Sequence, residues 1–562
     1  MIKPKCDLSF TGIIGIFLLL TICFISACND HHVTIKEKKI VAKPEDINLS
    51  AEDIIEGTLK DVLHNGKQIE DSFQLKNASI LQHIYNEFSF QPIWSRKGSF
   101  LNNGDSLFRL MDSAQNYGLF SSDYYYTKLS SLKNQLKHDT SAQVKLDAAK
   151  WAYSDLLLTS AFVQIVKDLS KGRLLPDSLL ATDSLLTPQF FSSQLKEFSR
   201  NNIDSFTAQL EPASPEYNKL KKGLRRFLTK AHFKNYTIIK PKDSLLFPEL
   251  VYKRLSEDDS SLLDNPAPDS ASIARAIKKY QKKKGLKVDG KVSGLLVEKL
   301  NDTDKERFIR IAITLDKYKM LQPLPQQYIW VNIPSYYLQV IDSDTVVLKS
   351  KVVVGKPETK TPLITSAITD LITYPKWHIP ESIIKKDILP GLKKDPGYTI
   401  RKGYSLFDED GNEIDPYKVT WAKFKEGIPY SVVQGSGDEN ALGVMKFNFP
   451  NKYSVYLHDT NQRYLFGKSK RALSHGCVRV QAWQELTNFI LRNDSLNSTK
   501  FVPVDSVNNW LALKEKHLIP VRKKIPLYIR YFTCDVVKDD VVFYEDVYGD
   551  DRRIREKIFS NK

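Results

Sequence analysis

Two histidines and a cysteine stand close together in the segment YLHDTNQRYLFGKSKRALSHGCVRVQ, residues 456–481. A cysteine thiol becomes a nucleophile when it loses its proton, and the neutral imidazole of a histidine can accept that proton. Gly476 lies directly before Cys477 and lets backbone N–H groups approach a reacting carbonyl closely. His458, Gly476 and Cys477 would therefore supply the base, the oxyanion donors and the nucleophile for acyl transfer through a thioester.

Zinc binding is a competing interpretation, because His458, His475 and Cys477 are all of residue types that bind this metal. Structural zinc sites normally have four ligands in paired spacings such as C-x-x-C or H-x-x-x-H. Neither spacing occurs in this segment. We therefore expect no metal site.

The flanking residues predict the elements that hold these groups. YSVYLHD, residues 453–459, alternates as a strand does and puts His458 on the face opposite Leu457. His458 would then face out of the core if Leu457 faces into it. QAWQELTNFIL, residues 481–491, has the apolar spacing of an amphipathic helix. Cys477 is thus expected shortly before a helix N-terminus, where the helix dipole favours the thiolate.

Length and composition indicate a folded protein of about two to four domains. The chain has 562 residues, of which 42% are apolar and 11% aromatic. Its formal charge of +16 favours polyanionic partners. No nucleic-acid-binding motif is present in the sequence, so we expect no nucleic-acid partner. Anionic lipid surfaces and acidic cell-wall peptides are the remaining partners that this charge fits. Because the charge is spread along the chain, a solvated basic surface with no specific partner fits it equally well.

The N-terminus reads as an export signal. Lys3 and Lys5 precede an apolar run that ends in Ile-Ser-Ala-Cys at Cys28, and small residues before a cysteine resemble the lipobox of bacterial lipoproteins. We expect a signal peptide over residues 1–27, a lipidated Cys28 and a polar tether over 28–50. The protein would then be exported and lipid-anchored in the cell envelope, facing the periplasm. A permanent membrane anchor is the alternative.

Cysteine usage leaves Cys477 and Cys534 as the only thiols beyond the signal and Cys28. A disulfide between these two residues is therefore an alternative to a reactive Cys477. An exported protein of this size that depended on disulfides would normally contain more of them.

Changes of periodicity divide the rest of the chain. Helical spacing dominates residues 51–250, a compact helical unit follows over 251–305, and segments typical of strands fill 325–505. A polar stretch over about 375–436 interrupts the strands and is interpreted as an inserted subdomain or lid. Residues 506–562 are expected to form a β extension that packs on the scaffold and catalytic domains. The expected fold class is multidomain α+β.

The motifs around the two catalytic candidates carry a family resemblance. HDT at His458 and SHGCVRV at residues 474–480 resemble the signature of the L,D-transpeptidases, whose catalytic domain is of the YkuD type. NALGVMKFNFPN, KWHIPESIIKKDILP and the C-terminal IPLYIRYFTCDVVKDDVVFYEDVYGDD are similar to segments of the large multidomain periplasmic type. Members of this type combine a helical scaffold domain, a peptidoglycan-binding module, a catalytic β-sandwich and a capping insertion.

Shorter motifs fit the other domains of this type. GRLLP and YGLFSSDYY resemble its scaffold. Tyr280-Gln281 and Val288-Asp289-Gly290 resemble the peptidoglycan-binding module, here a small three-helix domain over 251–305. Asn461 departs from the family pattern, which usually has a proline at this position, and this puts the geometry of the local loop in doubt.

The resemblance implies a two-step reaction on peptidoglycan. Cys477 would attack the carbonyl of the third residue of a donor tetrapeptide stem, release D-alanine and pass the thioester to the amine of an acceptor stem. His458 would be the general base, held in its tautomer by a backbone carbonyl near Asp459. The N–H groups of Gly476 and Cys477 would hold the oxyanion. Carbapenems, which acylate this family, would react with Cys477.

The resemblance also implies supporting residues. His475 would orient the nucleophile loop or the acyl group. Arg479 would bind a stem-peptide carboxylate, unless it forms a salt bridge that braces the turn. Further substrate contacts are expected from Ser474, Asn440, Tyr456 and Trp377. No cofactor is expected. The expected partners are peptidoglycan stem peptides and, through the N-terminal lipid, a membrane.

Two alternative functions fit the same residues. Water in place of the acceptor amine would make the protein an L,D-carboxypeptidase. A non-catalytic lipoprotein that ties the membrane to peptidoglycan is the other alternative, and an intact His458 and Cys477 argue against it.

Overall fold

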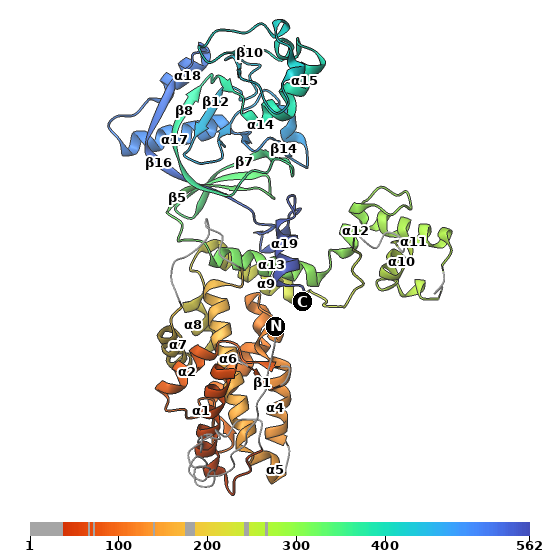
Figure 1. The fold of residues 1–562 in the computed structure, drawn as a ribbon, viewed down its shortest axis with the longest axis vertical. Coiled ribbons are helices and arrows are strands. Elements are labelled where there is room, and N and C mark those ends of the chain that lie inside the picture. The colour runs from red at the N-terminus through yellow and green to blue at the C-terminus, as the bar shows by residue number, and fades with distance from the viewer. Residues whose placement is uncertain are drawn as a thin grey trace, which may run out of the picture. The chain divides into compact units, whose positions relative to one another are not determined.

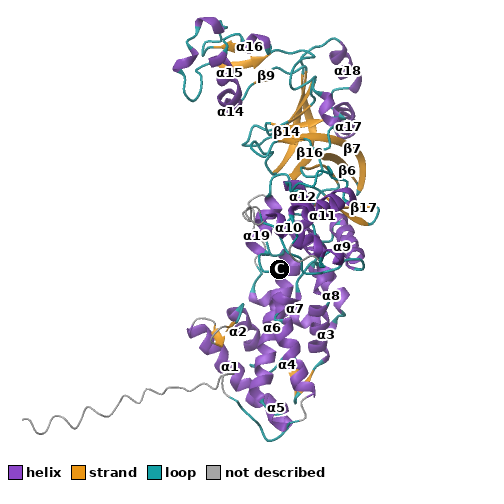
Figure 2. Ribbon diagram, turned by 90° about the vertical axis from the view of Figure 1, so that its right-hand side faces the viewer, coloured by secondary structure: helices purple, strands orange, loops and turns teal. Residues whose placement is uncertain are grey.

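The computed structural model describes residues 38–65, 68–70, 73–138, 141–174, 186–240, 247–264 and 268–562, shown as ribbons in Figures 1 and 2. The predicted signal peptide and Cys28 lie outside the described residues, as does part of the predicted tether. Within the described part of the chain, no helix is both long enough and apolar enough to cross a membrane. The chain divides into two compact units.

The first unit is helical and comprises the described residues up to 111 together with 122–164 and 187–200. Two short strand pairs, β1 (Gln68–Glu70) with β2 (Phe73–Gln74) and β3 (Ser95–Arg96) with β4 (Ser99–Phe100), lie between its helices. The helices are α1 (Ile47–Asn65), α2 (Ala78–Glu87), α3 (Asn102–Asp112), α4 (Tyr126–His138), α5 (Ala142–Lys145), most of α6 (Ala148–Lys171), and α7 (Pro188–Arg200).

A buried carboxylate organises this first unit. α6 is buried along most of its length rather than on one stripe, so it is a central helix. Its Asp155 accepts hydrogen bonds from the backbone N–H groups of Ile93 and Trp94, both at 2.9 Å, and from the Tyr85 hydroxyl at 2.7 Å. Burial raises the pKa of Asp155 to about 6. These bonds attach the loop before β3 to the central helix.

The second unit contains the helices α8 (Ile203–Leu210), α9 (Pro215–Leu228), α13 (Asp304–Lys319) and α19 (Asp550–Ile558). α13 packs against both α9 and α19. The first two residues of the GRLLP motif, Gly172 and Arg173, have a role in this packing. The Arg173 guanidinium forms a buried ion pair of 2.8 Å with Asp316 on α13. Gly172 has φ +73°, and a Cβ there would lie 3.0 Å from Asp316. The motif therefore closes the end of α6 onto α13.

Residues 247–301 form a small helical module with its own core, made by α10 (Phe247–Ser256), α11 (Ser270–Lys283) and α12 (Gly294–Asn301). The Gln281 carbonyl oxygen accepts from the N–H groups of Asp289 and Gly290 at 3.0 and 2.9 Å. The Gln281 amide nitrogen donates to the Asp289 carboxylate at 3.0 Å. Gln281 and the Asp289-Gly290 turn thus have a structural role, which accounts for their spacing without a ligand.

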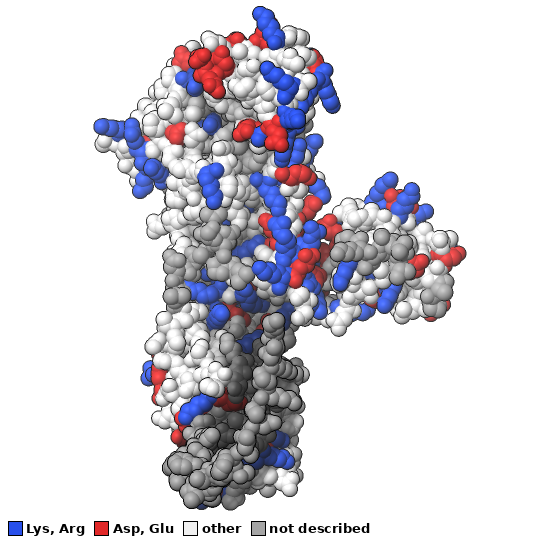
Figure 3. All heavy atoms as spheres, viewed as in Figure 1, with Lys and Arg blue, Asp and Glu red and all other residues white. Residues whose placement is uncertain are grey.

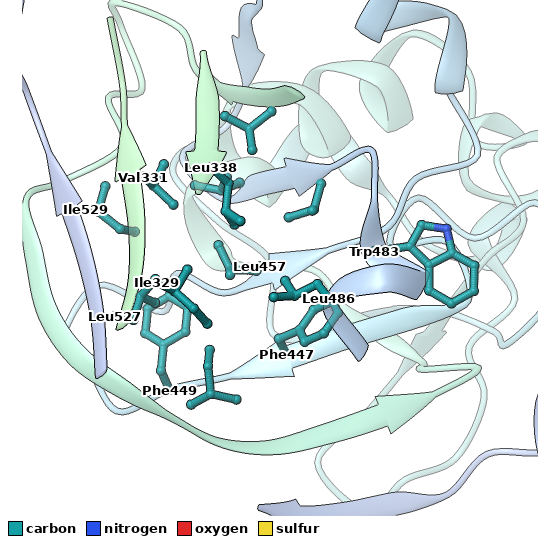
Figure 4. Packing of buried hydrophobic residues seen from close by; sticks show 14 of the residues in the cluster. Ile329, Val331, Leu338, Phe447, Phe449, Leu457, Trp483, Leu486, Leu527 and Ile529 are labelled. Carbon is teal, nitrogen blue, oxygen red and sulfur yellow. The ribbon is translucent and has the colours of Figure 1, made fainter. Parts of the chain in front are cut away.

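The catalytic region is built on one mixed sheet of nine strands in the order β14-β7-β15-β13-β12-β8-β16-β5-β6. β7 also pairs with β6, so the sheet closes on itself. The core inside it is apolar and is covered in part by α17 (Trp483–Asn497) (Figure 4). The strands are β5 (Gln327–Asn332), β6 (Tyr337–Asp342), β7 (Thr345–Gly355), β8 (Ile364–Thr373), β12 (Met445–Asn448), β13 (Leu457–His458), β14 (Ala472–Ser474), β15 (Val478–Val480) and β16 (Leu518–Arg530).

The polar stretch over 375–436 folds around a separate apolar core. Its strands β9 (Trp377–His378), β10 (Tyr404–Phe407) and β11 (Ser431–Gln434) form a three-stranded sheet. Its helices are α14 (Glu381–Ile383), a π-helix at Ile384–Ile388, α15 (Leu389–Lys394) and α16 (Tyr398–Arg401). A helical region followed by a mostly β catalytic region with an inserted subdomain confirms the multidomain α+β prediction.

The stretch predicted as a β extension is partly a component of the main sheet. β16 pairs in parallel with β5 and antiparallel with β8, so the sheet is incomplete without residues beyond 505. The same stretch holds α19, most of α18 (Val504–Ala512), and a hairpin of β17 (Cys534–Val537) and β18 (Asp540–Phe543). Strand periodicity alone could not distinguish an extension from a sheet strand.

Candidate active site

Three neighbouring strands place five polar side chains on one face of the sheet. Lys446 on β12 is opposite His458 on β13, and His458 is opposite Arg479 on β15. The residues that alternate with them are fully buried in the core, so the polar side chains point to the other face. Tyr456 lies two residues before His458, and Cys477 lies two residues before Arg479, so the same alternation puts both on this face. We call this set the active-site face: Lys446, Tyr456, His458, Cys477 and Arg479.

The His458 imidazole is fixed in one tautomer. Its Nδ1 lies 2.5 Å from the carbonyl oxygen of Asp459, and because a carbonyl only accepts, Nδ1 carries the hydrogen and Nε2 is left with the lone pair. Burial lowers the pKa of His458 to about 3, with a smaller contribution in the same direction from the Arg479 charge. The imidazole is therefore neutral at neutral pH and able to accept a proton. His458 lies on the face opposite Leu457, yet only 4% of it is exposed.

The loop after His458 depends on a glycine that the sequence motifs did not single out. The Asp459 carboxylate accepts from the Val444 N–H at 3.1 Å and from the Arg463 guanidinium at 3.0 Å. Gly443 has φ +63°, and a Cβ at this position would lie 2.2 Å from Oδ2 of Asp459. Asn461, at the position where the family usually has proline, donates to the Glu439 carbonyl at 3.0 Å. Side-chain contacts to the 439–444 loop therefore hold the HDT turn in place.

Cys477 is partly buried and reduced, and it directly precedes a strand. β15 begins at Val478 and α17 at Trp483, so a helix does begin shortly after Cys477, as predicted, but a strand that was not predicted lies between them. Val478–Val480 extends because it must pair with β13 and β7. Burial raises the pKa of the Cys477 thiol, against the opposing effects of Tyr456, Lys446 and Arg479.

The alternative of a disulfide between Cys477 and Cys534 is wrong. Cys477 and Cys534 are both free thiols in the structure. Cys534 is buried, and its sulfur lies 3.1 Å from the Thr314 hydroxyl on α13. Burial raises the pKa of Cys534 to about 12, so this thiol is an inert core group.

The turn before Cys477 is closed by side-chain hydrogen bonds. The Ser474 hydroxyl donates to the Cys477 carbonyl at 2.6 Å and accepts from the Gly476 N–H at 3.1 Å. The Gly476 N–H could therefore bind an oxyanion, as predicted, only if its hydrogen bond to the Ser474 hydroxyl breaks. Ser474 is 2% exposed and braces the turn, and its predicted substrate contact stays a prediction. Thr361, which the sequence did not indicate, donates to the Gly476 carbonyl at 2.8 Å.

Arg479 carries a charge that no carboxylate of the described residues neutralises in a salt bridge. Its Nη1 donates to Gln462 Oε1 at 2.8 Å and to the Thr460 hydroxyl at 3.3 Å, and both acceptors are neutral. Its buried Nε has no hydrogen-bond partner among the described residues, and none of their carboxylates forms a salt bridge with it. Burial lowers the pKa of Arg479. The salt-bridge alternative thus finds no partner in the described chain, and the guanidinium suits an anionic ligand.

The inserted subdomain contacts the active-site face and the loops beside it at three places. Nε2 of His475 lies 2.8 Å from the Asp387 carboxylate on the π-helix of the insertion. The Trp377 side chain on β9 acts on the ionisation of the Tyr456 hydroxyl, as does the Cys477 thiol. Asn440 donates to the carbonyls of Pro375 and Gly435, at the two ends of the insertion, at 3.2 and 2.7 Å. Asn440 is buried, and its predicted substrate contact stays a prediction.

A pocket of about 490 Å³ adjoins the turn before Cys477. Its walls are mainly apolar and aromatic, with charged groups among them. It is lined by Ile333, Lys360, Thr361, Pro362, Leu363, Tyr453, Val455, His475, Gly476, Tyr531, Tyr548, Asp550 and Arg553.

The site thus combines a thiol and an imidazole on one face of the sheet, with the imidazole oriented by a carbonyl and with two cations on the same face. The described residues contain no group of three or more His, Cys, Asp or Glu side chains that could hold a metal ion.

On the face shown in Figure 3, Lys and Arg side chains are interspersed with Asp and Glu.

Comparison with known proteins places this site in a family. Residues 326–505 match the L,D-transpeptidase catalytic domain, YkuD, and residues 79–224 match a family described as a scaffold domain. A Haemophilus influenzae protein named "Putative L,D-transpeptidase" is 36% identical over 254 residues, which are 45% of this chain and 50% of that protein. The chain spans about half the length of this relative. It therefore contains an L,D-transpeptidase catalytic domain and a scaffold domain, as the motifs predicted.

Proposed function

We propose that the protein is a peptidoglycan L,D-transpeptidase that crosslinks the third residues of stem peptides. The observation that carries this proposal is the position of Cys477 and His458 on one face of adjacent strands, inside the matched catalytic domain, with Nδ1 of His458 held by the Asp459 carbonyl. This arrangement leaves Nε2 to take the thiol proton.

The first step forms an acyl-enzyme. The Cys477 sulfur attacks the carbonyl carbon of the third residue of a donor tetrapeptide while its proton passes to Nε2 of His458. The C–N bond to D-alanine breaks, and the imidazolium returns the proton to the departing amine. The Cys477 N–H supports the oxyanion. The Arg479 guanidinium, which has only neutral partners, binds a carboxylate of the stem peptide.

The second step transfers the acyl group. An amine of an acceptor stem attacks the thioester carbonyl and gives a proton to His458, the C–S bond breaks, and the thiolate of Cys477 takes the proton back. The peptide bond formed in this way joins two third residues. Water in place of the amine would give hydrolysis by the same residues.

Product analysis tests the proposal. The purified protein is incubated with disaccharide-tetrapeptides, and products are identified by mass spectrometry. Dimers linked between third residues, together with released D-alanine, are expected. Tripeptide without dimer would assign hydrolysis instead. If a folded protein with a free Cys477 thiol yields neither dimer nor D-alanine, and forms no covalent adduct with a carbapenem, the non-catalytic anchor replaces the proposal.

We further propose that the protein is exported and attached to a membrane by a lipid on Cys28. The support for this is the sequence of residues 1–28, which lie outside the described structure. Cells that express the full chain and are fed a labelled fatty acid should incorporate the label into the wild type but not into a Cys28→Ala variant. Labelling of both proteins, or of neither, would contradict the proposal.

A further inference from the structure

Lys446 is a charged residue of the active-site face that no motif indicated. It lies on β12 directly opposite His458, and its Nζ is 4.1 Å from the centre of the Tyr456 ring. The Tyr456 side chain in turn opposes the rise that burial causes in the pKa of the Cys477 thiol. Lys446 is partly buried and belongs to no salt bridge within the described chain. An ammonium group is thus held over the aromatic ring that contacts the nucleophile.

The charges around the thiol are all positive. Lys446 and Arg479 both act on Cys477, as does the neutral Tyr456 side chain, and the Ser454 carbonyl oxygen lies 3.9 Å from the sulfur. The acid that acts on Lys446 is Asp370 on β8, which accepts a hydrogen bond from Asn448. His475 lies on the turn before Cys477, and its partner there is Asp387 of the insertion. Among the described residues, the charged groups that act most strongly on the thiol are therefore two cations.

The two cations have opposite effects on the catalytic pair. A positive charge stabilises a thiolate and destabilises an imidazolium. His458 lies between Lys446 and Arg479 in the strand register, so its protonated form is disfavoured from both sides. Negative charge on the Cys477 sulfur is favoured by the same two groups.

We infer that Lys446 is a positioning residue for the nucleophile, holding Tyr456 against Cys477 through a cation–π contact and stabilising the negative charge that develops on the sulfur. This inference rests on the proposed function, since it deepens the account of the same site. When the thiol reacts, the S–H proton passes to His458, the sulfur becomes negative, and Lys446 keeps its own proton throughout. No other reactant is required.

Alkylation of Cys477 by iodoacetamide tests the inference without peptidoglycan. The rate is measured by intact mass over a range of pH for the wild type, Lys446→Met and Lys446→Arg. The loss of one partly screened charge corresponds to about 1 kcal/mol, so Lys446→Met should react about fivefold more slowly at neutral pH, with its rate profile displaced to higher pH. Lys446→Arg should restore the profile. Lys446→Gln replaces Lys446→Met if the latter does not fold.

Lys452→Met is the matched control. Lys452 is exposed and lies 5.3 Å from the Tyr453 ring, so this variant removes the same charge and a similar ring contact at a residue outside the active-site face. Its alkylation profile should equal that of the wild type. A Lys446→Met or Lys446→Gln profile identical to the wild type would overturn the inference, as would an equal displacement in Lys452→Met. A displaced alkylation profile in a protein that forms no crosslinks would leave the inference standing and reject the transpeptidase function.

Discussion

The Thr361 hydroxyl donates to the carbonyl oxygen of Gly476 at 2.8 Å and accepts from the Gly355 N–H at 2.8 Å. The Tyr548 hydroxyl completes the set, because it accepts from the Thr361 N–H at 3.1 Å and donates to the Gly355 carbonyl at 2.7 Å. The backbone on the N-terminal side of the nucleophile is thus attached to the end of β7 and to the C-terminal segment of the chain. This linkage supports the position of Cys477 without touching it.

Thr361→Val should slow the acylation of Cys477. The change leaves the buried carbonyl of Gly476 and the N–H of Gly355 without partners, each at a cost of about 1–3 kcal/mol, and lets the turn shift. A displacement of a fraction of an ångström is expected to lower the second-order rate of carbapenem acylation by about tenfold or more. The rate is measured by intact mass.

Thr361→Ser is the control for this variant, because it keeps the hydroxyl and should acylate at nearly the wild-type rate. Equal losses in the Val and Ser variants would mean that the methyl group, and not the hydrogen bonds, supports the turn.

His458→Gln should slow acylation far more than Thr361→Val. Removing a general base typically costs about 10²- to 10⁴-fold in rate, and glutamine cannot take the thiol proton. Cys477→Ser should abolish the thioester adduct, which is read by intact mass after incubation with a carbapenem. A His458→Gln protein that acylates at the wild-type rate while Cys477→Ser does not react would show that another group, or water, takes the proton.

The candidate pair of His458 and Cys477 could be selected from the sequence because its signal is local. HDT and SHGC are contiguous motifs, and strand alternation alone placed His458 opposite Leu457. The supporting residues could not be predicted, because their roles depend on contacts between distant parts of the chain. Thr361 is separated from Gly476 by 115 residues, and Lys446 joins the site only through the register of β12 with β13. The helix after Cys477 was also predicted, but the strand Val478–Val480 before it was not, because its pairing with β13 and β7 joins distant parts of the chain.

Gly443→Ala should destabilise the protein and impair the HDT turn. Gly443 combines φ +63° with a Cβ position 2.2 Å from Oδ2 of Asp459, so the alanine is strained and also displaces the carboxylate. The loss in the free energy of unfolding, measured with urea, is expected to exceed the roughly 1–2 kcal/mol that a left-handed alanine costs by itself.

Gly411→Ala is the control variant, because it should introduce the backbone strain of a left-handed alanine without a steric contact. Gly411 has φ +84°, and a Cβ there would have no atom within 4 Å. The difference between the two glycine variants therefore measures the contact with Asp459. Equal losses of stability would mean that the loop moves aside at little cost.

The His475–Asp387 pair should couple the inserted subdomain to the nucleophile turn. The two side chains are partly exposed, so the interaction energy is expected to be about 0.5–1 kcal/mol. His475→Ala and Asp387→Ala should each slow carbapenem acylation by about two- to fivefold, and the double variant should be no slower than the worse of the two. Strictly additive losses would show that the pair does not act as a unit.

The buried His458 should make stability depend on pH below neutrality. Its pKa is about 3 in the folded protein and about 6.5 in an unfolded chain. Between these values the unfolded chain binds a proton that the folded protein does not, so the free energy of unfolding falls as the pH drops from about 6.5 towards 3. Above about pH 6.5 this contribution is complete and constant. The slope of the decline is at most about 1.4 kcal/mol per pH unit from this one group.

Urea unfolding of the wild type and His458→Gln at pH 5, 6 and 7.5 measures this effect, because the variant lacks the group that titrates. The wild type should lose about 1–2 kcal/mol more than His458→Gln between pH 7.5 and 5. His232→Gln, which removes an exposed histidine, serves as the control and should follow the wild type. Parallel curves for all three proteins would mean that the folded protein takes up the proton at His458 as readily as the unfolded chain does, and that the imidazole is not held neutral by its surroundings.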